Sequence, residues 1–198
     1  MDTGVGDQFR GAEGGVVHEG AQRATRIQTF QVVHVPGLLQ TEDHMRAMFG
    51  YSSPDMPKRY LDAFVEFRSQ RQQILTSSPE TPYEAVVHEA ALGIRVGGRH
   101  TAQGQLKQIL QRAELANVTV RVLPFDTEDF AGTGYSMLYL HGPVPQLDTA
   151  QIDTAHRGEL FDAESRLRQY RQRYERVAAT ALAPAESRDL MTRIAQEL

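Results

Sequence analysis

The sequence predicts an α+β fold, with a mixed sheet of about four strands covered by helices on at least one face and a long C-terminal helix. Apolar residues recur at helical spacing in three long stretches, whereas shorter valine-rich stretches alternate with polar residues as strands do. The predicted order of elements is helices, strand, helix, three strands and helices. This order is typical of α+β proteins.

The segment 34–44 predicts a strand end, a turn and a helix start. Pro36 fixes φ and Gly37 permits a positive φ, so the pair predicts a tight turn after an apolar run. Thr41 is expected to be an N-cap. The two carboxylates that follow it would lie in the first turn of the helix, where the helix dipole favours negative charge.

The later elements follow from apolar spacing and from proline and glycine. Ser53-Pro54-Asp55 is expected to start a long amphipathic helix that ends near Thr76. The other predicted elements are a strand at 83–89, a helix at 101–115, strands at 118–123 and 135–140, a weaker strand at 146–153, a helix at 160–181 and a short helix from Pro184.

Length and composition predict one globular domain. The chain has 198 residues, of which 40% are hydrophobic and 23% charged. Residues 1–24 are glycine-rich without a helical period, so we expect a flexible leader followed by a single sensing-type domain at 25–198. The net charge of −4 argues against a free-standing nucleic-acid binder, which usually has a basic surface.

Several kinds of site are excluded or not expected. The chain has no cysteine, so it has no disulfide, thiolate metal site or cysteine nucleophile. Its seven histidines include no pair at metal-ligand spacing, and no nucleotide-binding glycine motif is present, so we expect neither metal nor cofactor. No apolar run has the length of a membrane span and no signal peptide is evident, which predicts a cytoplasmic protein without membrane contact.

Proton transfer is the main chemistry left to the chain if it is an enzyme. The candidate acids and bases are Glu42, Glu89 and Asp153, with His34, His88 or Tyr135 as proton partners. His88 and Glu89 are neighbours on a predicted strand and point to opposite faces, so at most one of them can enter a given pocket. Each candidate has a structural alternative as a cap, an ion-pair member or a core residue.

A ligand cavity is expected where three segments meet: the Pro36-Gly37 turn, the strand end at Glu89 and the loop from Phe125 to Tyr135. These segments combine turn flexibility, aromatic surface and polar groups. Arg121 is a candidate ligand anchor because it lies on the strand face opposite three valines, where a guanidinium needs an anion or water. The predicted ligand-binding residues are Gln40, Glu89, Arg121, Phe125, Phe130 and Tyr135.

Four ordered motifs resemble a known family. They are VPGLLQTEDH at 35–44, EAAL followed by VGG at 89–98, LPFD at 123–126 and LAPAES at 182–187. Across about residues 25–198 the chain resembles the C-terminal domain of unknown function of actinobacterial Cro/repressor-like (XRE-type) helix-turn-helix regulators, the WhiJ-like, antitoxin-like group. The resemblance implies a sensing half, here without the DNA-binding domain. Between His88 and Glu89 it favours Glu89, because the family pattern has an acidic residue there.

Two functions follow as expectations. The first is a domain that binds a small molecule, a small partner protein or both, since the family's partner is often a short protein encoded nearby. The alternative is a cofactor-free cyclase, isomerase or hydrolase of specialised metabolism evolved from that domain. A third hypothesis is a scaffold or dimerisation module without any ligand. The chain alone is not expected to bind DNA, and it could form a homodimer.

Overall fold

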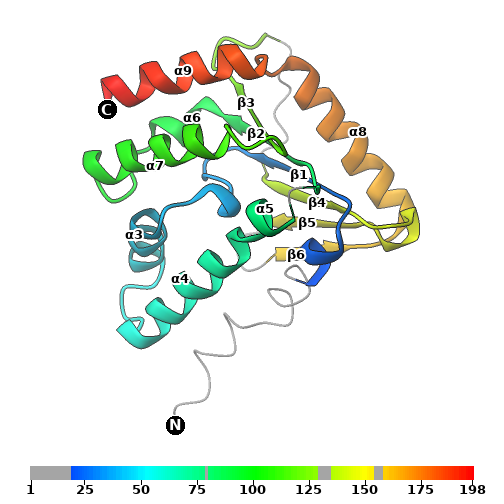
Figure 1. Ribbon diagram of the computed structural model, residues 1–198, viewed down its shortest axis with the longest axis horizontal. Coiled ribbons are helices and arrows are strands. Elements are labelled where there is room, and N and C mark those ends of the chain that lie inside the picture. Colours follow the sequence, from blue (N-terminus) through cyan, green and yellow to red (C-terminus); the bar gives the residue numbers. More distant parts are fainter. Residues whose placement is uncertain (1–18, 79, 129–134, 154–157) are drawn as a thin grey trace.

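A computed structural model describes residues 19–78, 80–128, 135–153 and 158–198, and a six-stranded mixed sheet lies at its centre (Figure 1). The strand order is β3-β2-β1-β4-β5-β6. The first three strands are parallel, and β4, β5 and β6 are added antiparallel. The strands are β1 (Arg26–Gln31), β2 (Tyr83–His88), β3 (Val118–Leu123), β4 (Met137–His141), β5 (Thr149–Asp153) and β6 (Gly158–Phe161).

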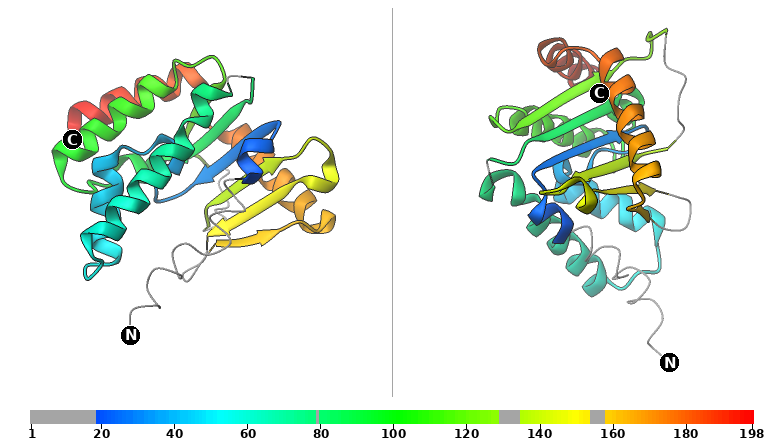
Figure 2. Two further views of the ribbon diagram at one scale, coloured as in Figure 1. Left: turned by 60° about the horizontal axis from the view of Figure 1, so that its bottom comes forward. Right: turned by 90° about the vertical axis from the view of Figure 1, so that its right-hand side faces the viewer.

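Helices cover both faces of the sheet, which confirms the α+β prediction. Helix α8 lies against one face, and α4, α7 and α9 lie on the other (Figures 1 and 2). The helices are α3 (Glu42–Ser52), α4 (Lys58–Gln72), α5 (Ile74–Ser77), α6 (Glu89–Gly93), α7 (Arg99–Arg112), α8 (Glu164–Thr180) and α9 (Pro184–Glu197), with 3-10 turns η1 (Gly37–Leu39) and η2 (Pro145–Leu147). In the described part of the chain, no helix is both long and apolar enough to cross a membrane.

The alternation of side chains along the strands produces two cores. On one face, Ile27, Tyr83 and Val120 pack with residues of α7 and α9. On the other face, Phe30 and Tyr139 pack against α8 through buried residues at helical spacing: Leu167, Tyr170, Tyr174 and Val177.

The sheet has more strands than the predicted four, because β1 and β6 lack a clear apolar period. The apolar run at 32–35 lies after β1, not in it. Within β1, Gln28 and Thr29 are buried polar residues, and the Thr29 hydroxyl donates to the Met137 carbonyl at 2.9 Å. Strand β6 has only four residues and pairs with β5 alone.

The predicted helix start at Ser53-Pro54-Asp55 is wrong. Helix α4 begins at Lys58 after Pro57, because a residue that precedes proline is disfavoured in the helical region, and Met56 therefore stays outside. The expected long helix also breaks at Gln73, so that α5 is separate. The N-cap at Thr41 is confirmed, since its hydroxyl oxygen accepts from the His44 N–H.

The topology brings the predicted site residues to one edge of the sheet. This edge holds the carboxyl ends of β1, β2 and β3, and the antiparallel register places the start of β4 and the end of β5 there as well. Asp153 is the last residue of β5 at this edge, and the residues that follow or precede a strand there are His34, Glu89, Phe125 and Tyr135. They lie there on different faces and in different surroundings.

Candidate functional site

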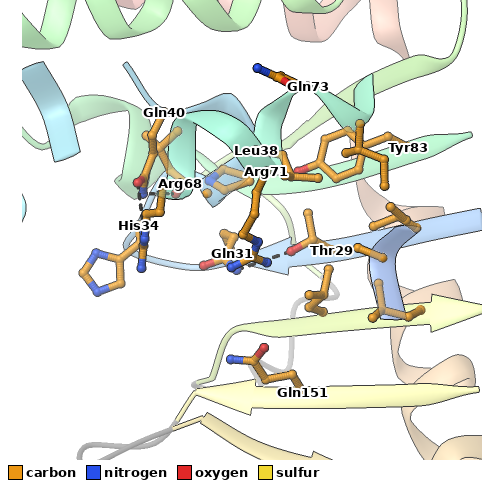
Figure 3. Close-up of a pocket in the computed structure, with 18 of the residues that line it drawn as sticks. Thr29, Gln31, His34, Leu38, Gln40, Arg68, Arg71, Gln73, Tyr83 and Gln151 are labelled. Carbon is orange, nitrogen blue, oxygen red and sulfur yellow. Dashed lines mark hydrogen bonds between the residues drawn. The ribbon is translucent and has the colours of Figure 1, made fainter. Parts of the chain in front are cut away.

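A cavity of about 730 Å³ lies between the sheet and helices α4 and α5 (Figure 3). Strands β1, β4 and β5 form its floor, and the two helices form its roof. The segment after β1 forms one wall. The lining includes Thr29, Gln31, Leu138, Leu140, Gln151 and Asp153 from the floor, Arg68, Arg71, Gln73, Ile74 and Ser77 from the roof, and His34, Pro36, Gly37, Leu38 and Gln40 from the wall.

Two glutamines from different helices hold the wall in place. The Gln72 side chain on α4 donates to the carbonyls of Gly37 at 2.9 Å and Gln40 at 2.7 Å. The Gln105 side chain on α7 donates to the Leu39 carbonyl at 2.7 Å and accepts from the Thr41 N–H at 2.8 Å. We call Gln72 and Gln105 the glutamine clamp. The clamp gives the carbonyls of the buried residues Leu39 and Gln40 hydrogen-bond partners within the protein.

Gln40 links the wall to the roof. It is buried, and its Nε2 donates to the Val35 carbonyl at 2.8 Å. Its Oε1 accepts from Nη1 of Arg68 at 3.1 Å. Gly37, next to this bond, does not adopt the positive φ that glycine permits, and a Cβ there would lie 3.9 Å from Nη1 of Arg68. The predicted ligand residue Gln40 therefore orients an arginine at the cavity wall.

Arg68 and Arg71 face the cavity without an ion-pair partner among the described residues. The Arg68 guanidinium lies 4.7 Å from the centre of the Phe49 ring, and that of Arg71 lies 6.0 Å from the Phe67 ring. Burial lowers the pKa of both groups, and the charge of Arg71 further lowers the pKa of Arg68, to about 10. Both remain protonated at neutral pH.

Among the described residues, Asp153 is the carboxylate that lines this cavity. Removal from water raises its pKa, although Gln151, Arg68 and His34 act in the opposite direction. The Gln151 amide donates to its Oδ1 at 3.0 Å. The cavity thus brings together three of the predicted site residues: Asp153, His34 and Gln40.

Glu89, His88 and Phe125 lie outside the cavity lining and make a contact of their own. Glu89 Oε2 accepts from the Phe125 N–H at 2.8 Å. His88 Nδ1 accepts from the Ala90 N–H at 3.1 Å, and its ring lies edge-on to Phe125 with 5.2 Å between ring centres. These bonds tie the ends of β2 and β3 together. Of the three segments expected to share a cavity, the Pro36-Gly37 turn lines it, and the described residues of the other two do not. Glu89 begins α6, and its carboxylate is directed to the loop after β3.

The other predicted residues also lie apart from the cavity. Arg121 donates to the carbonyls of Ala181 at 2.7 Å and Leu182 at 3.0 Å, where α8 ends. Glu42 is exposed and accepts from the Ser69 hydroxyl at 3.4 Å. Tyr135 stacks on the guanidinium of Arg173 at 5.6 Å. Phe130 lies outside the described residues.

Sequence reasoning missed Arg68 and Arg71, because arginines on an amphipathic helix usually belong to its solvated face. A signal was nonetheless present. Val65, Arg68 and Gln72 are spaced by three and four residues, so the buried stripe of α4 continues into polar side chains. A polar end to a buried stripe indicates a polar cavity or a buried hydrogen-bonding partner.

The described residues contain no group of three or more His, Asp or Glu side chains that could hold a metal ion. No curated protein and no solved structure matches the chain. The model of a family described as a domain of unknown function, DUF5753, matches residues 16–193, which is most of the chain. The chain therefore belongs to the DUF5753 family.

Proposed function

We propose that this chain is a sensing domain that binds a small molecule in the cavity between α4 and the sheet. The observation that carries the proposal is the cavity itself. Its volume of about 730 Å³ falls within the range of small-molecule pockets, roughly 300–1,000 Å³, and its lining combines apolar side chains with polar and charged ones.

A prebuilt wall supports the same proposal. The glutamine clamp fixes the turn at 36–41 from two helices, so the cavity does not have to form when a ligand arrives. A site that is already formed loses less conformational entropy on binding. The VPGLLQTEDH motif then has a physical purpose, since it supplies both the wall and the first turn of α3.

The motifs' resemblance to the sensing half of actinobacterial XRE-type regulators suggests what the binding is for. A ligand that contacts Arg68 would act on Gln40 and, through the clamp, on α7. The signal would pass to a small partner protein or to a DNA-binding partner. In this proposal the chain itself works without DNA, metal or cofactor.

A thermal-shift screen tests the proposal with defined probes: amino acids, sugars, nucleosides, nucleotides, aliphatic acids and aromatic acids. At least one class should raise the melting temperature saturably, because a ligand that binds only the folded state stabilises it. Leu138→Trp, which places an indole in the cavity, should abolish the shift. Leu147→Trp is the matched control, because Leu147 is exposed in η2. If every shift persists in Leu138→Trp, this cavity is not the site.

An enzyme is the second candidate, and the placement of Asp153 and His34 in one cavity favours it. A carboxyl group with a raised pKa in the same cavity as an imidazole suits general acid-base catalysis. Each molecule that binds in the screen should be incubated with the chain and followed by mass spectrometry. The enzyme proposal is supported if a bound molecule is converted by the wild type but not by Asp153→Asn or His34→Gln, while both variants still bind it. If the mass of every bound molecule stays unchanged, the sensor proposal is favoured.

A further inference from the structure

The polarity of the cavity changes along β1. At the start of the strand, Ile27 is paired with Tyr83 on one side and Leu140 on the other, and all three line the cavity. Thr29 and Gln31 follow on the same face, and His34 lies beyond the strand end. Figure 3 shows Tyr83 at one end of the cavity and Gln31 and His34 toward the other.

The roof follows the same gradient. Ile74 of α5 is buried and lines the cavity, whereas Arg68 and Arg71 of α4 reach down toward β1 near His34 and Gln31 (Figure 3). The cavity therefore has a cationic end and an uncharged end, where Ser77 and Gln22 accompany the apolar side chains. We call the uncharged end the apolar end.

The charge at the cationic end is not balanced by the described part of the protein. Two guanidinium groups and one carboxylate, Asp153, line the cavity, and neither arginine forms an ion pair there. Asp153 accepts from Gln151 rather than from an arginine. Keeping two like charges close together and partly buried is costly, and an incoming anion would offset that cost.

We infer that the ligand is an organic anion with an apolar body: its anionic group lies between Arg68 and Arg71, and its chain or ring extends toward Ile27, Leu140 and Tyr83. This inference rests on the proposed function, whose ligand it assigns to a chemical class. A guanidinium binds a carboxylate or phosphate through paired N–H donors, and the planar fork suits both groups. The apolar end selects against small inorganic anions, which cannot fill it.

Matched pairs of probes that differ only in charge test the inference. The aliphatic pair is decanoate and decanol, and the aromatic pair is naphthylacetate and naphthylacetamide. We expect at least one carboxylate to bind about tenfold or more tightly than its neutral partner in calorimetric titration. Arg68→Gln and Arg71→Gln should each lower the affinity for the carboxylate by about tenfold and leave the affinity for the neutral partner unchanged. Arg193→Gln is the control, since it removes the same charge from an exposed position on α9.

The outcomes separate this inference from the proposed function. Neutral probes that bind as tightly as carboxylates, or carboxylate affinity that survives both arginine substitutions, overturn the anion assignment. If Leu138→Trp still abolishes the binding of those probes, the cavity remains a binding site and only the assigned ligand class is wrong. Inorganic phosphate that binds as tightly as the carboxylates would overturn the role of the apolar end. Failure of all four organic probes, with other molecules still binding in the cavity, also counts against the assignment.

Discussion

His44 is a buried histidine whose surroundings keep it neutral. Its Nδ1 has no hydrogen-bond partner among the described residues, and burial, with the charges of His34 and Arg68, lowers its pKa from 6.5 to about 4. Between these two values the unfolded chain binds more protons than the folded chain, so stability falls as the pH drops from 6.5 toward 4. Because of His44, the free energy of unfolding is about 2 kcal/mol lower at pH 5 than at pH 7.

His44→Phe should remove this cost while conserving a ring of similar size. We expect the free energy of unfolding of the wild type to fall by about 2 kcal/mol more than that of the variant between pH 7 and pH 5. Urea titrations at both pH values measure the difference. The comparison isolates His44 from His88 and His141, whose pKa values burial also lowers. Parallel losses in the two proteins would show that His44 does not titrate as described.

Two substitutions of Glu89 distinguish a structural role of its carboxylate from a role in ligand binding or catalysis. Its carboxylate accepts the Phe125 N–H, and a glutamine carbonyl can accept the same bond. We expect Glu89→Gln to keep its stability and its ligand binding, and Glu89→Ala to lose about 1–2 kcal/mol of unfolding free energy. Urea unfolding and the thermal-shift assay measure these two effects. A fully stable Glu89→Gln variant that no longer binds ligand would place Glu89 in the site after all.

Individual residues were predictable where one local rule decides their role. The Thr41 cap depends only on its neighbours. Gln40 and the acid-base candidates His34 and Asp153 line the observed cavity, although Glu89 and Phe125 of the expected cavity lie outside its lining. Arg68 and Arg71 depend on which face of α4 meets the sheet. The spacing of Val65, Arg68 and Gln72 indicates that face but not which strands lie opposite it.

The glutamine clamp joins the turn after β1 to α4 and α7. Gln105→Ala would leave the Leu39 carbonyl and the Thr41 N–H without this partner in a buried place. We expect a loss of about 2–3 kcal/mol in the free energy of unfolding, measured by urea titration. Gln111→Ala, at an exposed position on the same helix, should change it by less than about 0.5 kcal/mol. Equal effects of the two substitutions would mean that the clamp contributes nothing beyond helix propensity.

Among the elements, β3 has the predicted bounds of 118–123, because alternating valines mark its buried face. Strands β1 and β6 could not be predicted from the sequence pattern, for physical reasons. The polar residues of β1 are satisfied by the β2 side chain of Glu84 and the β4 carbonyl of Met137, and β6 is a short edge strand with little to bury. These partners are distant in sequence, so a pattern within one segment cannot reveal them.

The whole molecule carries a net charge of −4, which disfavours contact with the phosphates of DNA. We expect no sequence-dependent binding to duplex DNA by this chain alone at about 150 mM salt, where nonspecific attraction is screened. Fluorescence anisotropy with promoter fragments and scrambled duplexes measures it. Submicromolar binding that distinguishes the two would contradict the expectation and would assign a DNA-reading surface to this domain.

The α+β class was predictable because it depends on the order of periodic segments. The cavity was not, because it arises where α4 and α5 lie over β1 and over β4 and β5, two strands that are distant from these helices in the sequence. Its exact walls depend on long-range pairing, such as that between β1 and β4.

A crystal structure of the chain with the tightest ligand from the screen is the sharpest test of the proposed cavity. We expect a ligand between α4 and the sheet, with its anionic group within hydrogen-bond distance of Arg68 and Arg71 and its apolar part against Tyr83 and Leu140. A ligand at the Glu89–Phe125 contact, or on the outer surface with the cavity filled only by water, would contradict it.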